Sequence, residues 1–164
     1  MMDRELLLAN IRKSLASISV PRFFETERGF QGALLAELTR RIPKYVLPDG
    51  AIIEQEYQKR LAEHGLTIRP DIIIHEPFDP NRHADQREGN LAVLELKLRA
   101  SKDEAAEDYK SLSKMIEVLR YPLGLFINIA SDATYVELIP RGAKTHIVAF
   151  AVSLREGHVR VVED

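Results

Sequence analysis

No cysteine occurs among the 164 residues of the sequence. Its absence excludes a disulfide framework, a thiolate metal site and a cysteine nucleophile. A chain without disulfides also suits a reducing compartment, so we expect a cytoplasmic protein.

Long apolar runs are equally scarce. The stretch from Leu6 to Ala9 is too short for the core of a signal peptide, and charged residues stand on both sides of it. Nothing later approaches the roughly 20 apolar residues that a helix needs to cross a bilayer. We therefore expect a protein without a membrane partner.

An excess of positive charge is also missing. The chain has 23 Lys and Arg against 25 Asp and Glu, a formal net charge of −2, so it lacks the overall basic field of many nucleic-acid-binding proteins. A local basic surface could still meet phosphates, and ordinary solvated charge is the alternative explanation of the same residues. The candidates are Arg40, Arg41 and Lys44, together with Lys97, Arg99 and Lys102.

The rest of the composition is that of a globular protein, with 45% apolar and 29% charged residues. A chain of this length fits one hydrophobic core, so we expect a single domain over residues 1–164. Periodicity predicts helices over 3–17 and 23–42, the second ending at Pro43, and isoleucine-rich strands over 51–57 and 67–75.

Residues 76–90 are polar and contain two prolines, which predicts a long loop. Loops of this length are usually functional, so we expect it to border the site. The strand predicted over 91–98 is apolar on both faces, as is typical of a central strand in an α/β fold. Ser101 is the expected N-cap of a helix over 102–119.

The last part of the chain reads as strands separated by turns. One buried strand is expected over 125–130, and an antiparallel meander should follow. Its strands are predicted over 134–139, 147–154 and 159–162.

Three charged residues stand where their neighbours predict burial. Alternation places Glu95 and Lys97 on one face of the strand 91–98, and Asp71 heads the apolar run Ile72–Ile74. A charge in such an environment needs a partner, a metal ion or water. Two acids and a lysine on adjacent strands would form a divalent metal site with an ammonium beside it.

The chemistry of a phosphodiesterase uses these residue types. Mg²⁺ prefers oxygen ligands and is commonly held by one or two carboxylates, here Asp71 and Glu95. The metal stabilises charge on the phosphate and lowers the pKa of a bound water, and Lys97 can orient or deprotonate that water.

The segment Pro70-Asp71 followed by Glu95-Leu96-Lys97 resembles the PD-(D/E)xK nuclease superfamily, with 23 residues between the two acids. The resemblance covers residues 23–130. It implies a restriction-endonuclease-like fold, in which a central mixed β-sheet is flanked by helices, here with the C-terminal strands as an antiparallel extension. It also implies a Mg²⁺ cofactor, with Mn²⁺ as a substitute, and allows the Leu96 carbonyl as a further metal ligand.

The family often contributes a glutamate from the preceding helix. Glu27 lies near the centre of the apolar stripe of the helix 23–42, so the resemblance assigns it to the metal site or to residues supporting that site. Gln31, one turn later, could hydrogen-bond to it. The alternative is a structural salt bridge between Glu27 and an arginine such as Arg69.

Other polar residues have simpler explanations. A solvated helix face accounts for Asp108 and Lys110, although acidic and basic residues often follow the ExK motif in the family, and Tyr109 is expected in the core. Glu54 and Glu56 share one face of the strand 51–57 and fit an exposed strand edge, and the alternative is that they reach the site. His64, His75 and His83 have no metal-ligand spacing, although His75 shares a strand face with Asp71.

The sequence therefore predicts metal-dependent hydrolysis of nucleic acid, with DNA as the expected substrate. Cutting both strands of a duplex is simplest with two sites, which favours a homodimer. One alternative is an inactive domain of the same fold that binds a partner or serves in an assembly. A second alternative is that Asp71, Glu95 and Lys97 form only a buried ion-pair network.

Overall fold

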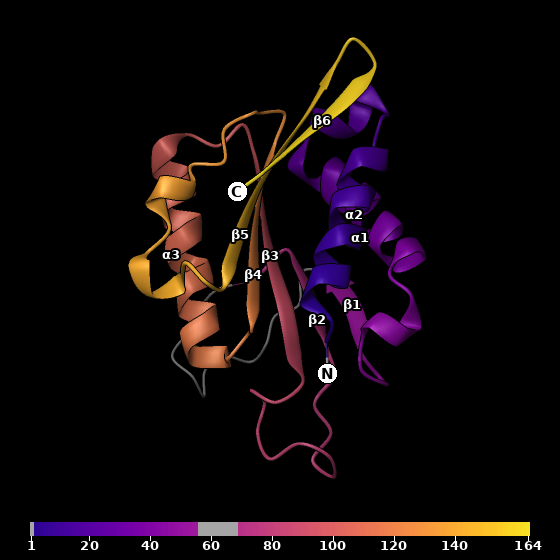
Figure 1. Ribbon diagram of the computed structural model, residues 1–164, viewed down its shortest axis with the longest axis vertical. Coiled ribbons are helices and arrows are strands. Elements are labelled where there is room, and N and C mark those ends of the chain that lie inside the picture. Colours follow the sequence, from indigo (N-terminus) through magenta and orange to yellow (C-terminus); the bar gives the residue numbers. More distant parts are fainter. Residues whose placement is uncertain (1, 56–68) are drawn as a thin grey trace.

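The computed structural model describes residues 2–55 and 69–164. Within these residues, six strands form one open mixed sheet in the order β1-β2-β3-β4-β5-β6. Helices α1 and α2 cover one face of the sheet, and α3 covers the other (Figure 1). The prediction of an α/β fold with a central mixed sheet flanked by helices is therefore confirmed.

Each α-helix is preceded by a residue whose side chain caps the helix N-terminus. The bounds are α1 Arg4–Ser17, α2 Glu27–Arg41 and α3 Lys102–Leu119. Asp3 caps α1, Thr26 caps α2, and Ser101 with Glu104 forms a capping box on α3. Because Thr26 is extended, α2 starts later than predicted, and Pro21–Phe24 form a separate 3₁₀ helix, η1.

The strands alternate in direction only at the two edges of the sheet. Their bounds are β1 Ile52–Gln55, β2 Ile72–His75, β3 Asn90–Leu98, β4 Leu123–Ile129, β5 Ile147–Arg155 and β6 His158–Glu163. The β1–β2, β2–β3 and β5–β6 pairs are antiparallel, whereas β3–β4 and β4–β5 are parallel. Residues 56–57 and 67–68, which belong to the strands predicted over 51–57 and 67–75, lie outside the residues that the structure describes.

The expected C-terminal meander is wrong in two respects. Residues 134–139 contain no strand but the 3₁₀ helix η4, Val136–Leu138, and η5 follows at Arg141–Ala143. β5 is parallel to β4, so the chain must cross one face of the sheet between them. The apolar residues that suggested a strand, including Val136 and Ile139, pack into the core beneath α3 instead. Only β6 extends the sheet in the antiparallel sense.

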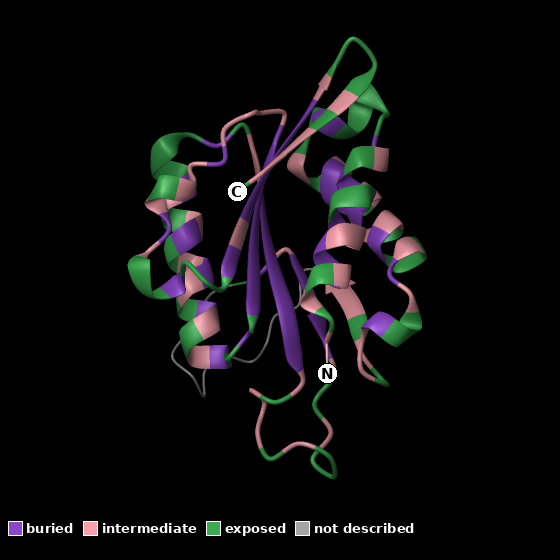
Figure 2. Ribbon diagram, viewed as in Figure 1, coloured by how far each residue is buried: buried purple, intermediate pink, exposed green. Residues whose placement is uncertain are grey.

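Two apolar clusters hold the layers together, one on each face of the sheet. Leu94 and Ile127 belong to the cluster that includes α1 and α2, and Val93 and Phe126 belong to the cluster beneath α3. Figure 2 shows β4 and most of β3 buried along their length. Within the described residues, no helix is long and apolar enough to cross a membrane.

Candidate functional site

The carboxyl-terminal half of β3 carries Glu95 and Lys97. Their neighbours Leu94 and Leu96 pack toward α1 and α2, so both charged side chains point to the α3 face. Glu95 is only 8% exposed and the Lys97 side chain 31%. A carboxylate and an ammonium therefore lie side by side in a largely desolvated layer.

Asp71 lies immediately before β2, at the point where the β2–β3 ladder ends. Ile72 pairs with Leu94, so continuing the register by one residue places Asp71 opposite Glu95. Pro70 has no backbone N–H and cannot extend the ladder. In its place, Asp71 Oδ2 accepts a 2.7 Å hydrogen bond from the Leu96 N–H. Because the N–H and C=O of a paired strand residue face the same partner, the Leu96 carbonyl faces the same gap.

The two carboxyl groups act as a coupled pair. Burial first, and then the charges of Asp71 and Asp108, raise the pKa of Glu95 well above its ordinary value. Burial also raises the pKa of Asp71, against the lowering effect of the Leu96 N–H. The charge of Asp71 raises the pKa of Glu95, so the two groups do not ionise independently of each other. Among the described residues, neither forms an ion pair.

Lys97 is paired with a residue of α3 rather than with the strand carboxyl groups. Its Nζ lies 3.9 Å from Asp108 Oδ2. Burial lowers the pKa of Lys97, but the surrounding acids, with Asp108 foremost, outweigh it and the net pKa is raised. Lys97 is therefore an ammonium at neutral pH. Asp108 itself is held by burial at a pKa of about 6.

Glu27 reaches the site from the other face of the sheet. It is the first residue of α2, and its Oε2 accepts a 3.3 Å hydrogen bond from the Leu98 N–H at the end of β3. The Gln31 amide donates to the Asp71 carbonyl at 3.1 Å, so it supports Asp71 rather than Glu27. The contact of Glu27 is thus with the backbone of β3, whereas the alternative was a salt bridge with an arginine such as Arg69. Its charge acts on Asp71, Lys97 and Asp108 through space.

The donor set suits a hard divalent cation that keeps several of its waters. Asp71 and Glu95 offer carboxylate oxygens, and the Leu96 carbonyl faces the same gap. Mg²⁺ needs only one or two carboxylates when water and phosphate complete its shell. Over the described ranges, no group of three or more acidic or imidazole side chains forms a ready cation cage. The residues therefore fit an open, largely hydrated ion.

Asp108 is the residue of this cluster that the sequence analysis explained differently. It was assigned to a solvated helix face, but its side chain is only 18% exposed. The signal was present, because Ala105, Asp108 and Leu112 follow helical spacing and both apolar neighbours are fully buried. Lys110 is exposed and Tyr109 is buried, as expected.

The long loop lies away from the site. Residues 76–89 join the end of β2 to the start of β3, whereas Asp71 precedes β2 and Lys97 is near the end of β3. Five residues of strand, about 16 Å, separate Asn90 from Glu95. The expectation that this loop borders the site is therefore wrong, because a hairpin loop and the entrance of its first strand lie at opposite ends.

The contacts change the interpretation of Glu54. Glu54 was expected at an exposed strand edge, but it has a side-chain partner, because its Oε2 lies 2.7 Å from Nε2 of the buried His75. Glu56 and His64 lie outside the described residues. His83 contacts Glu76 within the loop.

The proposed basic surface divides into two separate parts. Arg40 and Arg41 both donate to Glu37 at the far end of α2, about 20 Å along the helix from Glu27. Arg99 and Lys102 are exposed at the end of β3 and the start of α3. Only the second part is beside the acidic cluster.

A cavity of about 350 Å³ lies beyond the carboxyl ends of the parallel strands. Its lining includes Arg99 after β3, Ala130 after β4 and Arg155 at the end of β5, with Glu25 and Phe24 on the side of η1. Arg99 and Ala130 both adopt positive φ angles, of 49° and 55°. None of Asp71, Glu95, Lys97 and Asp108 is among the residues that line this cavity, so it is separate from the acidic cluster.

In comparisons with known proteins, no family model, curated protein or solved structure matches the chain.

Proposed function

We propose that this protein hydrolyses phosphodiester bonds in nucleic acid, with DNA as the substrate, at a site formed by Asp71, Glu95 and Lys97. One observation carries the proposal: the buried Glu95 and the partly buried Asp71 face each other, neither has an ion-pair partner among the described residues, and a lysine that remains charged lies beside them. Such an arrangement is costly for stability and is expected where function requires it.

The order of elements is also consistent with the restriction-endonuclease-like fold. A helix precedes the β2–β3 hairpin, and α3 then leads to β4, which is parallel to β3. This is the order that the PD-(D/E)xK resemblance implies. We therefore propose the restriction-endonuclease-like fold together with the activity.

Asp71 and Glu95 would hold Mg²⁺ or Mn²⁺, with the Leu96 carbonyl as a further ligand and Glu27 beside them. The ion would stabilise charge developing on the phosphate and lower the pKa of a coordinated water. Lys97, because it stays protonated, is a hydrogen-bond donor to the phosphate or to the attacking water rather than a base. In the hydrolysis that this site would support, the oxygen of a water would bond to phosphorus, the bond to the sugar oxygen would break, and one proton would pass to the leaving oxygen.

The remaining residues position the substrate and the reacting groups. Glu27 and Gln31 fix the strand backbone on both sides of the carboxyl pair, through Leu98 and Asp71. Arg99 and Lys102 supply exposed positive charge beside the acidic cluster, where a nucleic-acid backbone would otherwise be repelled.

The test is whether the purified protein cleaves a linear duplex DNA and a single-stranded DNA. We expect cleavage with Mg²⁺ or Mn²⁺, none with EDTA, and a loss of at least about 100-fold in Glu95→Ala and in Lys97→Ala. Glu107→Gln, which removes an exposed charge from α3, is the matched control and should cut at the wild-type rate. Equal cleavage by all four proteins would show that the activity comes from a contaminant.

An inactive domain that binds a partner is the second candidate function. The net charge of −2 and the pairing of Arg40 and Arg41 with Glu37 favour it, since both weaken attraction to phosphates. Calorimetry with Mn²⁺ separates the two. Heat of binding that disappears in Asp71→Ala supports the metal site, whereas no heat with the wild-type protein supports the partner-binding domain.

A further inference from the structure

The Lys97 ammonium lies between two sets of acids but contacts only one. Within the described residues its ion pair is with Asp108 of α3, at 3.9 Å between Nζ and Oδ2. It forms no ion pair with Asp71 or Glu95, although both act on its charge through space. A lysine side chain free to move would be expected to form an ion pair with Asp71 or Glu95. Another group must therefore hold the ammonium near α3.

Asp108 is in an unfavourable position for a residue with only a structural role. Its Oδ2 is buried and has no hydrogen-bond partner among residues 2–55 and 69–164. The same helix face carries Ala105, Tyr109 and Leu112, all fully buried. A position of this kind is normally apolar, because an ionised oxygen without hydrogen bonds is costly to bury. The separation of 3.9 Å is longer than a hydrogen bond, so the pairing with Lys97 compensates only part of that cost.

The charge of Asp108 has a larger effect on Lys97 than that of any other acid. Asp108 precedes Glu27, Asp71 and Glu95 among the charges that raise the pKa of the lysine. It also lies on a different layer from the carboxyl pair, since Asp71 and Glu95 belong to the strands and Asp108 to the covering helix. Its pull on the ammonium is therefore directed away from the sheet.

We propose that Asp108 is a positioning residue, which draws the Lys97 ammonium toward α3 and prevents it from closing on the Asp71–Glu95 pair. The inference rests on the proposed function, because an open carboxyl pair matters only if a cation is to enter it. Asp108 then has two effects. It leaves the carboxyl oxygens free for the cation, and it holds the lysine at one side, where its N–H groups can reach a phosphate or a water.

The first test is structural and needs no metal. Crystal structures of the metal-free wild type and Asp108→Asn are compared at one pH, with Glu107→Gln as the control for a lost charge on α3. In Asp108→Asn we expect Lys97 Nζ to move to about 3 Å from a carboxyl oxygen of Asp71 or Glu95. An unchanged lysine in the variant overturns the proposal. If Asp108→Asn does not fold, as judged by circular dichroism, Asp108→Ser takes its place.

The second test measures Mn²⁺ affinity by calorimetry in a double-mutant cycle. Asp108→Asn should weaken Mn²⁺ binding about tenfold when Lys97 is present, and should have no effect in a Lys97→Met background. Equal weakening in both backgrounds would mean that Asp108 contacts the ion itself, and the positioning role would be wrong. Absence of Mn²⁺ binding by the wild type would refute the proposed function, and the lysine position in the crystal structures would still decide the role of Asp108.

Discussion

Glu95 is a residue that costs the folded protein stability. It is nearly inaccessible to water, it has no cation partner in the described structure, and it faces another acid. Because its pKa in the folded state is raised far above 4.5, the folded protein binds more protons than the unfolded chain. Stability therefore falls as the pH rises from about 4.5 through the folded pKa, and is lowest where Glu95 must ionise.

Glu95→Gln should accordingly stabilise the metal-free protein at neutral pH. We expect a gain of about 1 kcal/mol or more at pH 7, which raises the melting temperature by roughly 2–4 °C in a chain of this size. The gain should shrink near pH 5, where the wild-type carboxyl group regains its proton. Thermal unfolding in EDTA at both pH values measures this. A variant less stable than the wild type at pH 7 would mean that Glu95 has a stabilising partner.

The residue scale also shows what the sequence could reveal about the site. Glu95 and Lys97 were identifiable because strand alternation gives each side chain a definite face. Asp71 was identifiable only as an acid beside an apolar run, since its bond to the Leu96 N–H depends on where the ladder stops. Asp108 was misjudged because an acid on an amphipathic helix has a common alternative explanation, a position on the solvated face.

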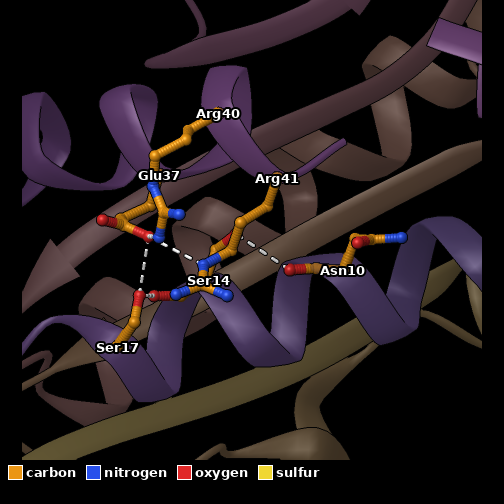
Figure 3. A network of polar contacts seen from close by, with 6 residues as sticks. All are labelled: Asn10, Ser14, Ser17, Glu37, Arg40 and Arg41. Carbon is orange, nitrogen blue, oxygen red and sulfur yellow. Dashed lines mark hydrogen bonds and ion pairs between the residues drawn. The ribbon is translucent and has the colours of Figure 1, made fainter. Parts of the chain in front are cut away.

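At the scale of elements, α1 and α2 are joined by a polar contact as well as by the core. Glu37 on α2 accepts hydrogen bonds from Arg40 and Arg41 on its own helix, both at 2.8 Å, and from Ser17 at the end of α1, at 2.9 Å (Figure 3). Hydrogen bonds from Arg41 and Arg40 lower the pKa of Glu37 to about 2. The carboxylate therefore links the two helices only while it is ionised.

The contribution of Glu37 to stability should be lost in acid. Its folded pKa lies below the ordinary 4.5, so its stabilising effect is present above about pH 4.5 and disappears as the pH falls toward 2. The side chain is partly exposed, so we expect Glu37→Gln to cost about 0.5–1 kcal/mol at pH 7. Urea unfolding at pH 7 and near pH 2.5 measures the difference between the two proteins. A difference of the same size at both pH values would contradict this account.

The bounds of the helices could be predicted from the sequence better than the directions of the strands. The bounds of α3 were predicted to the residue, because Ser101 caps its start. The start of α2 was predicted four residues too early, because the extended Thr26 separates it from η1. Strand direction could not be predicted in this way, because alternation and turn residues do not distinguish a parallel from an antiparallel neighbour. The segment 134–139 shows the same limit, since its apolar residues satisfy the core from a 3₁₀ helix.

At the scale of the whole molecule, the site exists only where three layers meet. Asp71, Glu95 and Lys97 belong to β3 and to the residue before β2, Glu27 belongs to α2, and Asp108 belongs to α3. Figure 1 shows that α2 and α3 lie on opposite faces of the sheet. Four acids and one lysine act on one another there. The fold thus concentrates negative charge at one end of an otherwise apolar sheet, and a divalent cation is the ligand that would offset it.

Bound metal should therefore stabilise the folded protein, because a ligand that binds the folded state and not the unfolded chain shifts the equilibrium toward folding. An ion that binds only the folded state at about 100 times its dissociation constant contributes about 2.7 kcal/mol, or roughly 5–10 °C in melting temperature. We expect this rise for the wild type with Mn²⁺, and none for Asp71→Ala, in which one carboxylate of the pair is gone. Asp103→Asn, which removes an exposed acid from α3, serves as the control and should respond like the wild type. An equal rise in Asp71→Ala would place the ion elsewhere on the acidic surface, and then the carboxyl pair would need another explanation.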